Sequence, residues 1–142
     1  MNGMRLLIPS LLVMFLAACG KPPEPAPTGP PPILLPTDYE WLKPAAASAL
    51  MEKTPGLGVI DVRDDSELGS GTLPKAQRLP WDQDPTQQLA SMDRNRPWLV
   101  YCAIGGRSEL LAQKMAKMEF KRVYLLRGGF NAWQAAGLPV QK

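Results

Sequence analysis

Histidine is absent from this chain of 142 residues. Its absence excludes a histidine general base and removes the commonest ligand of zinc. No cluster of cysteine, aspartate and glutamate shows metal-ligand spacing, so no metal site is predicted. The net charge is only +3, and no basic stripe carries interleaved aromatic side chains. The composition therefore does not indicate nucleic acid as a partner.

Long apolar runs are also lacking. The longest, residues 6–16, is interrupted by Pro9 and Ser10 and is too short to span a bilayer comfortably. Arg5 precedes this run, and the sequence Leu16-Ala17-Ala18-Cys19 ends it. The segment resembles the signal peptide and lipobox of bacterial lipoproteins. An ordinary secretory signal and a retained signal anchor are the alternatives.

The lipoprotein resemblance has consequences for location. It implies that residues 1–18 are removed, that Cys19 carries a lipid, and that the protein faces the periplasm from the bacterial cell envelope. Gly20 rather than aspartate follows Cys19, which by the same resemblance implies the outer membrane. Palmitate is a fatty acid expected at such an anchor.

Proline is concentrated directly after Cys19. We interpret residues 19–36 as a lipidated cysteine followed by an extended proline-rich linker, because such a composition cannot form a packed core. The linker would connect the membrane to a folded domain over residues 37–142. A proline-rich ligand for a partner domain is the alternative.

Cysteine is scarce, with Cys19 and Cys102 as the two examples. If Cys19 carries a lipid, Cys102 has no partner within the chain. Cysteines in an oxidising compartment are usually paired or absent, so a solitary thiol indicates chemistry. The alternative is an inert thiol, because free cysteine is among the most buried residue types.

The surroundings of Cys102 favour chemistry. Residues 98–101 are apolar and predict a buried strand, and residues 108–118 predict a helix. Gly105 and Gly106 allow a tight turn between them, with backbone N–H groups facing the thiol. These N–H groups and the helix N-terminus favour an anion. We therefore expect a lowered thiol pKa and a nucleophilic thiolate.

Strand and helix patterns alternate along residues 37–142. A capping box formed by Thr37 and Glu40 predicts a first helix, which Pro44 breaks. Strands are predicted at residues 59–63, 76–81, 97–101 and 122–126, and helices at residues 45–51, from Asp84, at 108–118 and at 128–133. This order indicates an α/β fold with a small, mainly parallel sheet and helices on both faces. In such sheets sites form beyond the carboxyl ends of the strands, where Cys102 lies.

Several motifs along the predicted domain resemble the rhodanese (sulfurtransferase) family. They are Val59-Ile60-Asp61-Val62-Arg63 with Glu67, Leu73-Pro74-Lys75-Ala76, the loop Cys102-x-x-Gly105-x-Arg107-Ser108, and Leu126-x-Gly128-Gly129-Phe130-x-Ala132-Trp133 followed by Gly137-Leu138-Pro139-Val140. The resemblance implies a rhodanese-like α/β fold in which Cys102 carries a persulfide. The chain departs from the family at Thr72 and Lys75, where histidine and glycine are frequent, and at Leu68, where an aromatic residue is usual.

The resemblance implies roles for the loop residues. The backbone amides of Ala103, Ile104, Gly105, Gly106 and Arg107 are expected to stabilise the outer sulfur of the persulfide. Arg107 attracts anionic donors such as thiosulfate if its side chain turns inward. An outward position beside Glu109 or in solvent is the alternative. Ser108 is expected to cap the helix rather than to act as a catalytic hydroxyl.

Two neighbouring residues complete the predicted site. Asp61 and Arg63 are expected to border the pocket, with an ion pair between Arg63 and Glu67 as the alternative role. Gly128 and Gly129 are assigned to a turn. No cofactor is implied, because the persulfide itself carries the sulfur. The implied partners are a small-molecule sulfur donor and a thiophilic acceptor such as cyanide or a thiol, and a protein acceptor stays open.

Two other functions compete with sulfur transfer. Phosphatases of the cysteine type have five residues between the cysteine and the arginine, whereas four separate Cys102 from Arg107. The smaller loop suits a single anionic sulfur better than a tetrahedral phosphate. A non-catalytic binding module that holds a protein or a soft metal ion at Cys102 is the second alternative, because one fold hosts many functions.

Overall fold

The computed structural model describes residues 39–142. The predicted signal peptide, Cys19 and the proline-rich linker lie outside the described residues. No helix within residues 39–142 has the length and apolar character needed to cross a membrane.

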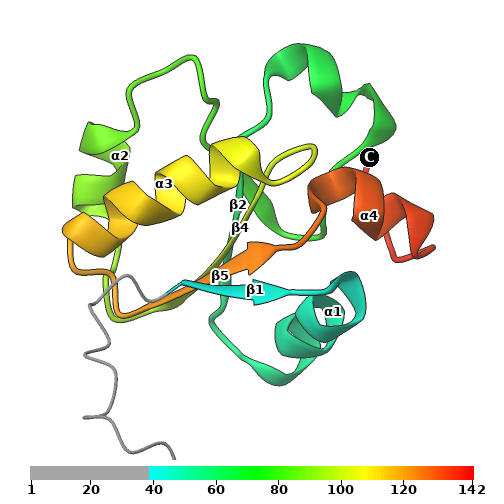
Figure 1. The fold of residues 1–142 in the computed structure, drawn as a ribbon, viewed down its shortest axis with the longest axis horizontal. Helices are drawn as coiled ribbons and strands as arrows, with labels where there is room; N and C mark the ends of the chain where they lie inside the picture. Colours follow the sequence, from blue (N-terminus) through cyan, green and yellow to red (C-terminus); the bar gives the residue numbers. More distant parts are fainter. Residues whose placement is uncertain (1–38) are drawn as a thin grey trace, which may run out of the picture. The chain divides into compact units, whose positions relative to one another are not determined.

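A five-stranded parallel sheet forms the centre of the described domain (Figure 1). In chain order its strands are β1 (Tyr39–Leu42), β2 (Gly58–Asp61), β3 (Ala76–Arg78), β4 (Pro97–Tyr101) and β5 (Arg122–Leu126). Their order across the sheet is β1-β5-β4-β2-β3, which places β4 in the middle. The predicted α/β fold with a small parallel sheet is confirmed.

Helices lie on both faces of the sheet. They are α1 (Pro44–Lys53), α2 (Thr86–Ser91), α3 (Gly106–Lys117) and α4 (Gly129–Ala135), with a short 3-10 helix, η1, at Asp65–Ser70. Residues from α2 and α3 pack into one apolar cluster, and residues from α1 and α4 pack into the other. Figure 1 shows the same division, with α3 above the sheet and α1 below it.

The central strand β4 contributes to both clusters. Trp98 and Val100 pack on the side of α3, whereas Leu99 and Tyr101 pack on the side of α1 and α4. Successive side chains of a strand point to opposite faces, so a strand that is apolar throughout serves a sheet covered on both sides. Cys102 continues the alternation and belongs to the cluster beside α3.

The helix predicted at the start of the domain is wrong. Residues Tyr39–Leu42 form β1, which pairs in parallel with β5. Tyr39 and Trp41 pack against the cluster beside α3, while Glu40 is exposed. This alternation has the period of a strand, and pairing with β5 stabilises the extended backbone more than a local cap stabilises a helix. The helix expected after Pro44 is confirmed as α1.

Other boundaries also differ from the prediction, and β2 ends at Asp61 rather than at residue 63. Strand β3 ends at Arg78 rather than at residue 81, before Pro80. Helix α2 begins at Thr86, and the Asp84 carboxylate accepts bonds from the Thr86 N–H and hydroxyl groups. Helix α3 begins at Gly106, two residues before the predicted start. The earlier start brings the first turn of α3 to the cysteine loop.

Candidate active site

Cys102 lies one residue beyond β4, at the carboxyl edge of the sheet. Its side chain is 0% exposed. The Gly105 N–H group donates a hydrogen bond to the Cys102 sulfur over 3.0 Å. Gly105 has a φ of 122°, a conformation that side chains disfavour, and this turn brings its N–H back toward Sγ. The thiol therefore sits within the turn of the loop.

The surroundings of Cys102 lower the pKa of its thiol. Burial opposes ionisation and raises the pKa. The backbone N–H groups of Ser108, Gly105 and Ile104, together with the Ser108 hydroxyl, outweigh that effect because they stabilise the thiolate. The predicted direction of the pKa shift agrees with this result, and the cause is hydrogen bonding from the loop and from the first turn of α3.

Ser108 occupies a different place from the one predicted. It lies within the first turn of α3, and Gly105 takes the cap position. The Ser108 hydroxyl is 2.8 Å from the Gly105 carbonyl oxygen and 3.7 Å from the Cys102 sulfur. A hydroxyl has one proton, so it can donate to only one of these acceptors at a time. Ser108 is thus a buried neighbour of the sulfur.

Helix α4 fixes the orientation of the cysteine loop. The Phe130 N–H donates to the Cys102 carbonyl over 2.8 Å, and the Asn131 N–H donates to the Ala103 carbonyl over 3.1 Å. Because a peptide N–H points opposite to its carbonyl, these bonds turn the N–H groups of Ala103 and Ile104 away from α4. The N-terminus of α4 therefore helps to aim the loop amides at the sulfur.

Gly129 permits this contact between α4 and the loop. A Cβ atom at this position would lie 2.4 Å from the Cys102 carbonyl oxygen and 2.5 Å from the Ala103 carbonyl oxygen. Its φ is 59°, in the left-handed region. The sequence assigned Gly129 only to a turn. The double glycine after a predicted strand was the available signal, but the contact itself joins segments distant in sequence.

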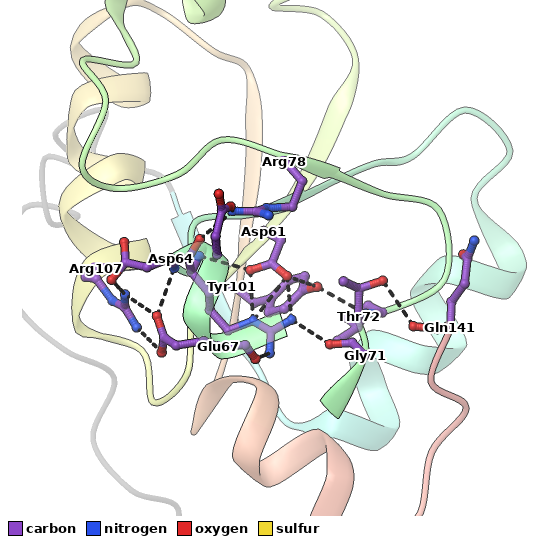
Figure 2. A network of polar contacts seen from close by, with 12 residues as sticks. Asp61, Asp64, Glu67, Gly71, Thr72, Arg78, Tyr101, Arg107 and Gln141 are labelled. Carbon is purple, nitrogen blue, oxygen red and sulfur yellow. Dashed lines mark hydrogen bonds and ion pairs between the residues drawn. The ribbon is translucent and has the colours of Figure 1, made fainter. Parts of the chain in front are cut away.

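Arg107 takes neither of the two positions considered from the sequence. Its guanidinium binds the Glu67 carboxylate through two contacts of 2.6 Å and the Asp64 carboxylate through one of 3.0 Å (Figure 2). The hydrogen bonds from Arg107 lower the pKa of Glu67 to about 2. In turn, the hydrogen bond to Glu67 raises the pKa of Arg107. Both groups are therefore charged at neutral pH.

Asp61 and Arg63 form a buried ion pair, with 2.6 Å between the Arg63 Nη2 and Asp61 Oδ2 atoms. Their side chains are 0% and 1% exposed, so they offer no surface that could border a pocket. Arg63 also donates to the backbone carbonyls of Glu67 and Gly71, and the Tyr101 hydroxyl donates to Asp61. The Arg63 partner considered from the sequence, the Glu67 carboxylate, is held by Arg107. The expected position of Asp61 and Arg63 at the pocket border is corrected. Both side chains lie inside the protein and bind residues of η1 and β4.

Phe130 links this buried network to the cysteine loop. The Arg63 guanidinium carbon lies 3.9 Å from the centre of the Phe130 ring. The backbone of Phe130 donates to Cys102, as described above. Burial and the neighbouring Asp61 raise the pKa of Tyr101, so its hydroxyl stays protonated as a donor. The network thus stabilises the residues that position the loop.

Two surface cavities within residues 39–142 lie away from the thiol. One lies at the amino ends of β1 and β5, beside Tyr39 and Arg122. Another lies between α1 and α4 and is lined in part by Met51 and Lys75. Within residues 39–142 no group of three or more cysteine, aspartate or glutamate residues is placed to hold a metal ion. The hydrogen bonds to its sulfur distinguish Cys102 as the candidate reactive group.

Comparison with known proteins agrees with this fold. The family model described as rhodanese-like domain matches residues 43–136. Thiosulfate sulfurtransferase GlpE of Vibrio cholerae is 32% identical over 96 residues, covering 68% of this chain and 89% of that protein. The chain therefore belongs to the rhodanese-like domain family and is a sulfurtransferase of the rhodanese type.

Solved structures show the same architecture. The rhodanese-related protein of Thermoplasma volcanium has a TM-score of 0.64 and 22% identity, covering 72% of this chain and 98% of that one. A protein of unknown function from Rhodopseudomonas palustris, described as a possible tyrosine phosphatase, has a TM-score of 0.61 and 29% identity, covering 72% and 85%. The first of these similarities supports the fold alone.

Proposed function

We propose that this protein transfers a sulfane sulfur through a persulfide on Cys102. The hydrogen-bonded cradle around the Cys102 sulfur carries the proposal, because its N–H groups stabilise an anion despite burial. The thiolate attacks the outer sulfur of a donor such as thiosulfate. A bond forms between the two sulfurs, the S–S bond of thiosulfate breaks, and sulfite leaves with the electron pair. An acceptor such as cyanide or a thiol then removes the outer sulfur and restores the thiolate.

The position of Arg107 disfavours phosphatase chemistry. A cysteine phosphatase needs an arginine that is free to bind the phosphate oxygens. Here Glu67 and Asp64 already occupy the Arg107 guanidinium. Together with the short spacing between Cys102 and Arg107, these contacts favour transfer of a single sulfur atom.

The persulfide is tested by intact mass. We expect the protein to gain one sulfur atom on incubation with thiosulfate and to lose it to cyanide, with formation of thiocyanate. The Cys102→Ser variant is the control and is expected to gain none, because a hydroxyl is a poor nucleophile toward sulfur. Sulfur addition at another residue, or none in the wild type, contradicts the proposal. Full biological activity of Cys102→Ser would then favour a binding module.

We also propose that the sulfurtransferase domain is anchored to the periplasmic side of the outer membrane by a lipid on Cys19. The signal-like run, the lipobox-like sequence and Gly20 support this location. We expect a labelled fatty acid such as palmitate to be incorporated into the wild type, which fractionates with membranes. Cys19→Ser should lose the label, whereas Cys102→Ser should keep it. Label retained in Cys19→Ser contradicts the proposed anchor.

A further inference from the structure

The cysteine loop lacks a free cation of its own. Ala103, Ile104, Gly105 and Gly106 carry no charge, and Ile104 is 72% exposed at the tip of the loop. Arg107, for which the sequence left a role in binding the donor open, binds two carboxylates. One positive and two negative charges thus sit together beside the loop. A dianion such as thiosulfate is not favoured by this cluster.

Another cation lies on the opposite side of the loop. Arg127 follows β5 directly, at the same carboxyl edge of the sheet as Cys102. Its backbone N–H donates to the Leu42 carbonyl at the end of β1, over 2.8 Å. The residue is exposed, and it forms no ion pair with any residue between 39 and 142. Its charge is therefore available, in contrast to that of Arg107.

Trp41 connects Arg127 to the cysteine loop. The Arg127 guanidinium carbon lies 5.7 Å from the centre of the Trp41 ring, within the range of a cation–π contact. The same ring borders Gly105, where an added Cβ atom would lie 3.3 Å from the Trp41 side chain. Gly105 in turn donates to the Cys102 sulfur. Three successive contacts therefore lead from the guanidinium to the thiol.

We propose that Arg127, held over Trp41, is the specificity-determining residue that draws anionic sulfur donors to Cys102. The inference rests on the proposed sulfur transfer and deepens it by naming the group that selects the donor. Arg127 acts by attraction and makes no bond to the reacting sulfur atoms. Its charge raises the local concentration of an anion and accelerates the encounter, an effect that salt screens. Neutral reagents gain nothing from this charge.

Paired alkylating reagents test the proposal independently of sulfur transfer. Iodoacetate is anionic and iodoacetamide is neutral, and both modify the Cys102 thiolate. Modification is followed by mass spectrometry of the peptide that contains Cys102, in the full chain at low salt. We expect Arg127→Gln to slow iodoacetate by about two- to sixfold, with the rate of iodoacetamide unchanged. Any loop opening that the buried thiol requires cancels in the ratio of the two rates.

Matched variants sharpen the test. Arg127→Lys retains the charge and is expected to keep most of the preference for iodoacetate. Arg122→Gln removes an exposed arginine at the other end of the same strand and should leave the ratio unchanged. Trp41→Leu should weaken the preference, because the guanidinium loses the ring that holds it. At about 1 M salt, where the screening length is roughly 3 Å, the difference between wild type and Arg127→Gln should vanish.

The outcomes separate this inference from the proposed function. An unchanged ratio of iodoacetate to iodoacetamide rates in Arg127→Gln overturns the role of Arg127, even if Cys102 accepts sulfur from thiosulfate. A lower ratio with no sulfur gained from thiosulfate overturns the proposed donor and leaves the anion-attracting role of Arg127 standing. If both hold, Arg127→Gln should slow persulfide formation from thiosulfate more than it slows iodoacetate, because thiosulfate carries two charges.

Discussion

Replacing Gly129 by alanine should reduce sulfur transfer by about 100-fold, because it displaces the loop that holds Cys102. The new Cβ atom would lie 2.4 Å from the Cys102 carbonyl and 2.5 Å from the Ala103 carbonyl. These neighbours are backbone atoms and cannot rotate away. The Cys102 and Ala103 carbonyls would move away from the N–H groups of α4. The loop N–H groups would then no longer point toward the Cys102 sulfur. We also expect the thiol pKa to rise toward the ordinary value of about 8.5.

The rate of Cys102 alkylation against pH measures this pKa. The N–H groups around the Cys102 sulfur stabilise the thiolate. Loss of these hydrogen bonds therefore raises the thiol pKa and shifts the formation of the reactive thiolate to higher pH. Gly137→Ala is the matched control, since Gly137 also has a positive φ, 68°, but would meet no atom within 4 Å. That control should lose about 1–2 kcal/mol of stability from backbone strain and keep the wild-type pH profile. Equal effects of the two variants on the profile would show that the loop does not depend on Gly129.

Breaking the buried ion pair should have the largest effect on stability. We expect Arg63→Met to lower the free energy of unfolding by about 3–5 kcal/mol, because Asp61 would remain charged and buried without its partner. The variant would also leave the carbonyls of Glu67 and Gly71 without their guanidinium donor. Urea unfolding at neutral pH measures the loss. The double variant Asp61→Leu with Arg63→Met should recover part of it, since no buried charge is stranded.

An exposed ion pair provides the comparison. Lys114 and Asp84 are 39% and 76% exposed, so Lys114→Met should change the free energy of unfolding by less than about 1 kcal/mol. If the folded Arg63→Met variant still accepts sulfur on Cys102 at nearly the wild-type rate, Arg63 stabilises the fold and does not bind the substrate. A stable Arg63→Met variant that fails to react with the donor would instead restore the role at the substrate predicted from the sequence.

Local patterns predicted much of the fold. The apolar runs at β2, β4 and β5 were found because strands buried on both faces need apolar residues at every position. The stripe formed by Leu111, Met115 and Met118 predicted α3 for a related reason. The strand β1 was missed because the capping box of Thr37 and Glu40 is a local signal, whereas β1 is stabilised by pairing with β5 far along the chain.

At the candidate site, too, the sequence predicts the features set by neighbouring residues but not the contacts between distant segments. The position of Cys102 after a buried strand, the turn at Gly105 and the direction of the thiol pKa shift follow from neighbouring residues. The partners of Arg107 do not, because Glu67 and Asp64 lie 40 and 43 positions away. The same holds for the Phe130 N–H group, which belongs to α4 and donates to the Cys102 carbonyl. Such contacts form only when parallel strands bring their carboxyl ends together.

The sequence by itself determined that Cys102 lies in a glycine turn between a strand and a helix, because backbone conformation and local hydrogen bonding depend mainly on adjacent residues. Only the tertiary structure decided which charges surround that thiol. It placed Asp61 and Arg63 inside the protein, paired Arg107 with Glu67, and left Arg127 exposed beside Trp41. Burial and pairing of charged side chains depend on which strands become neighbours, and the packing of the sheet sets that order.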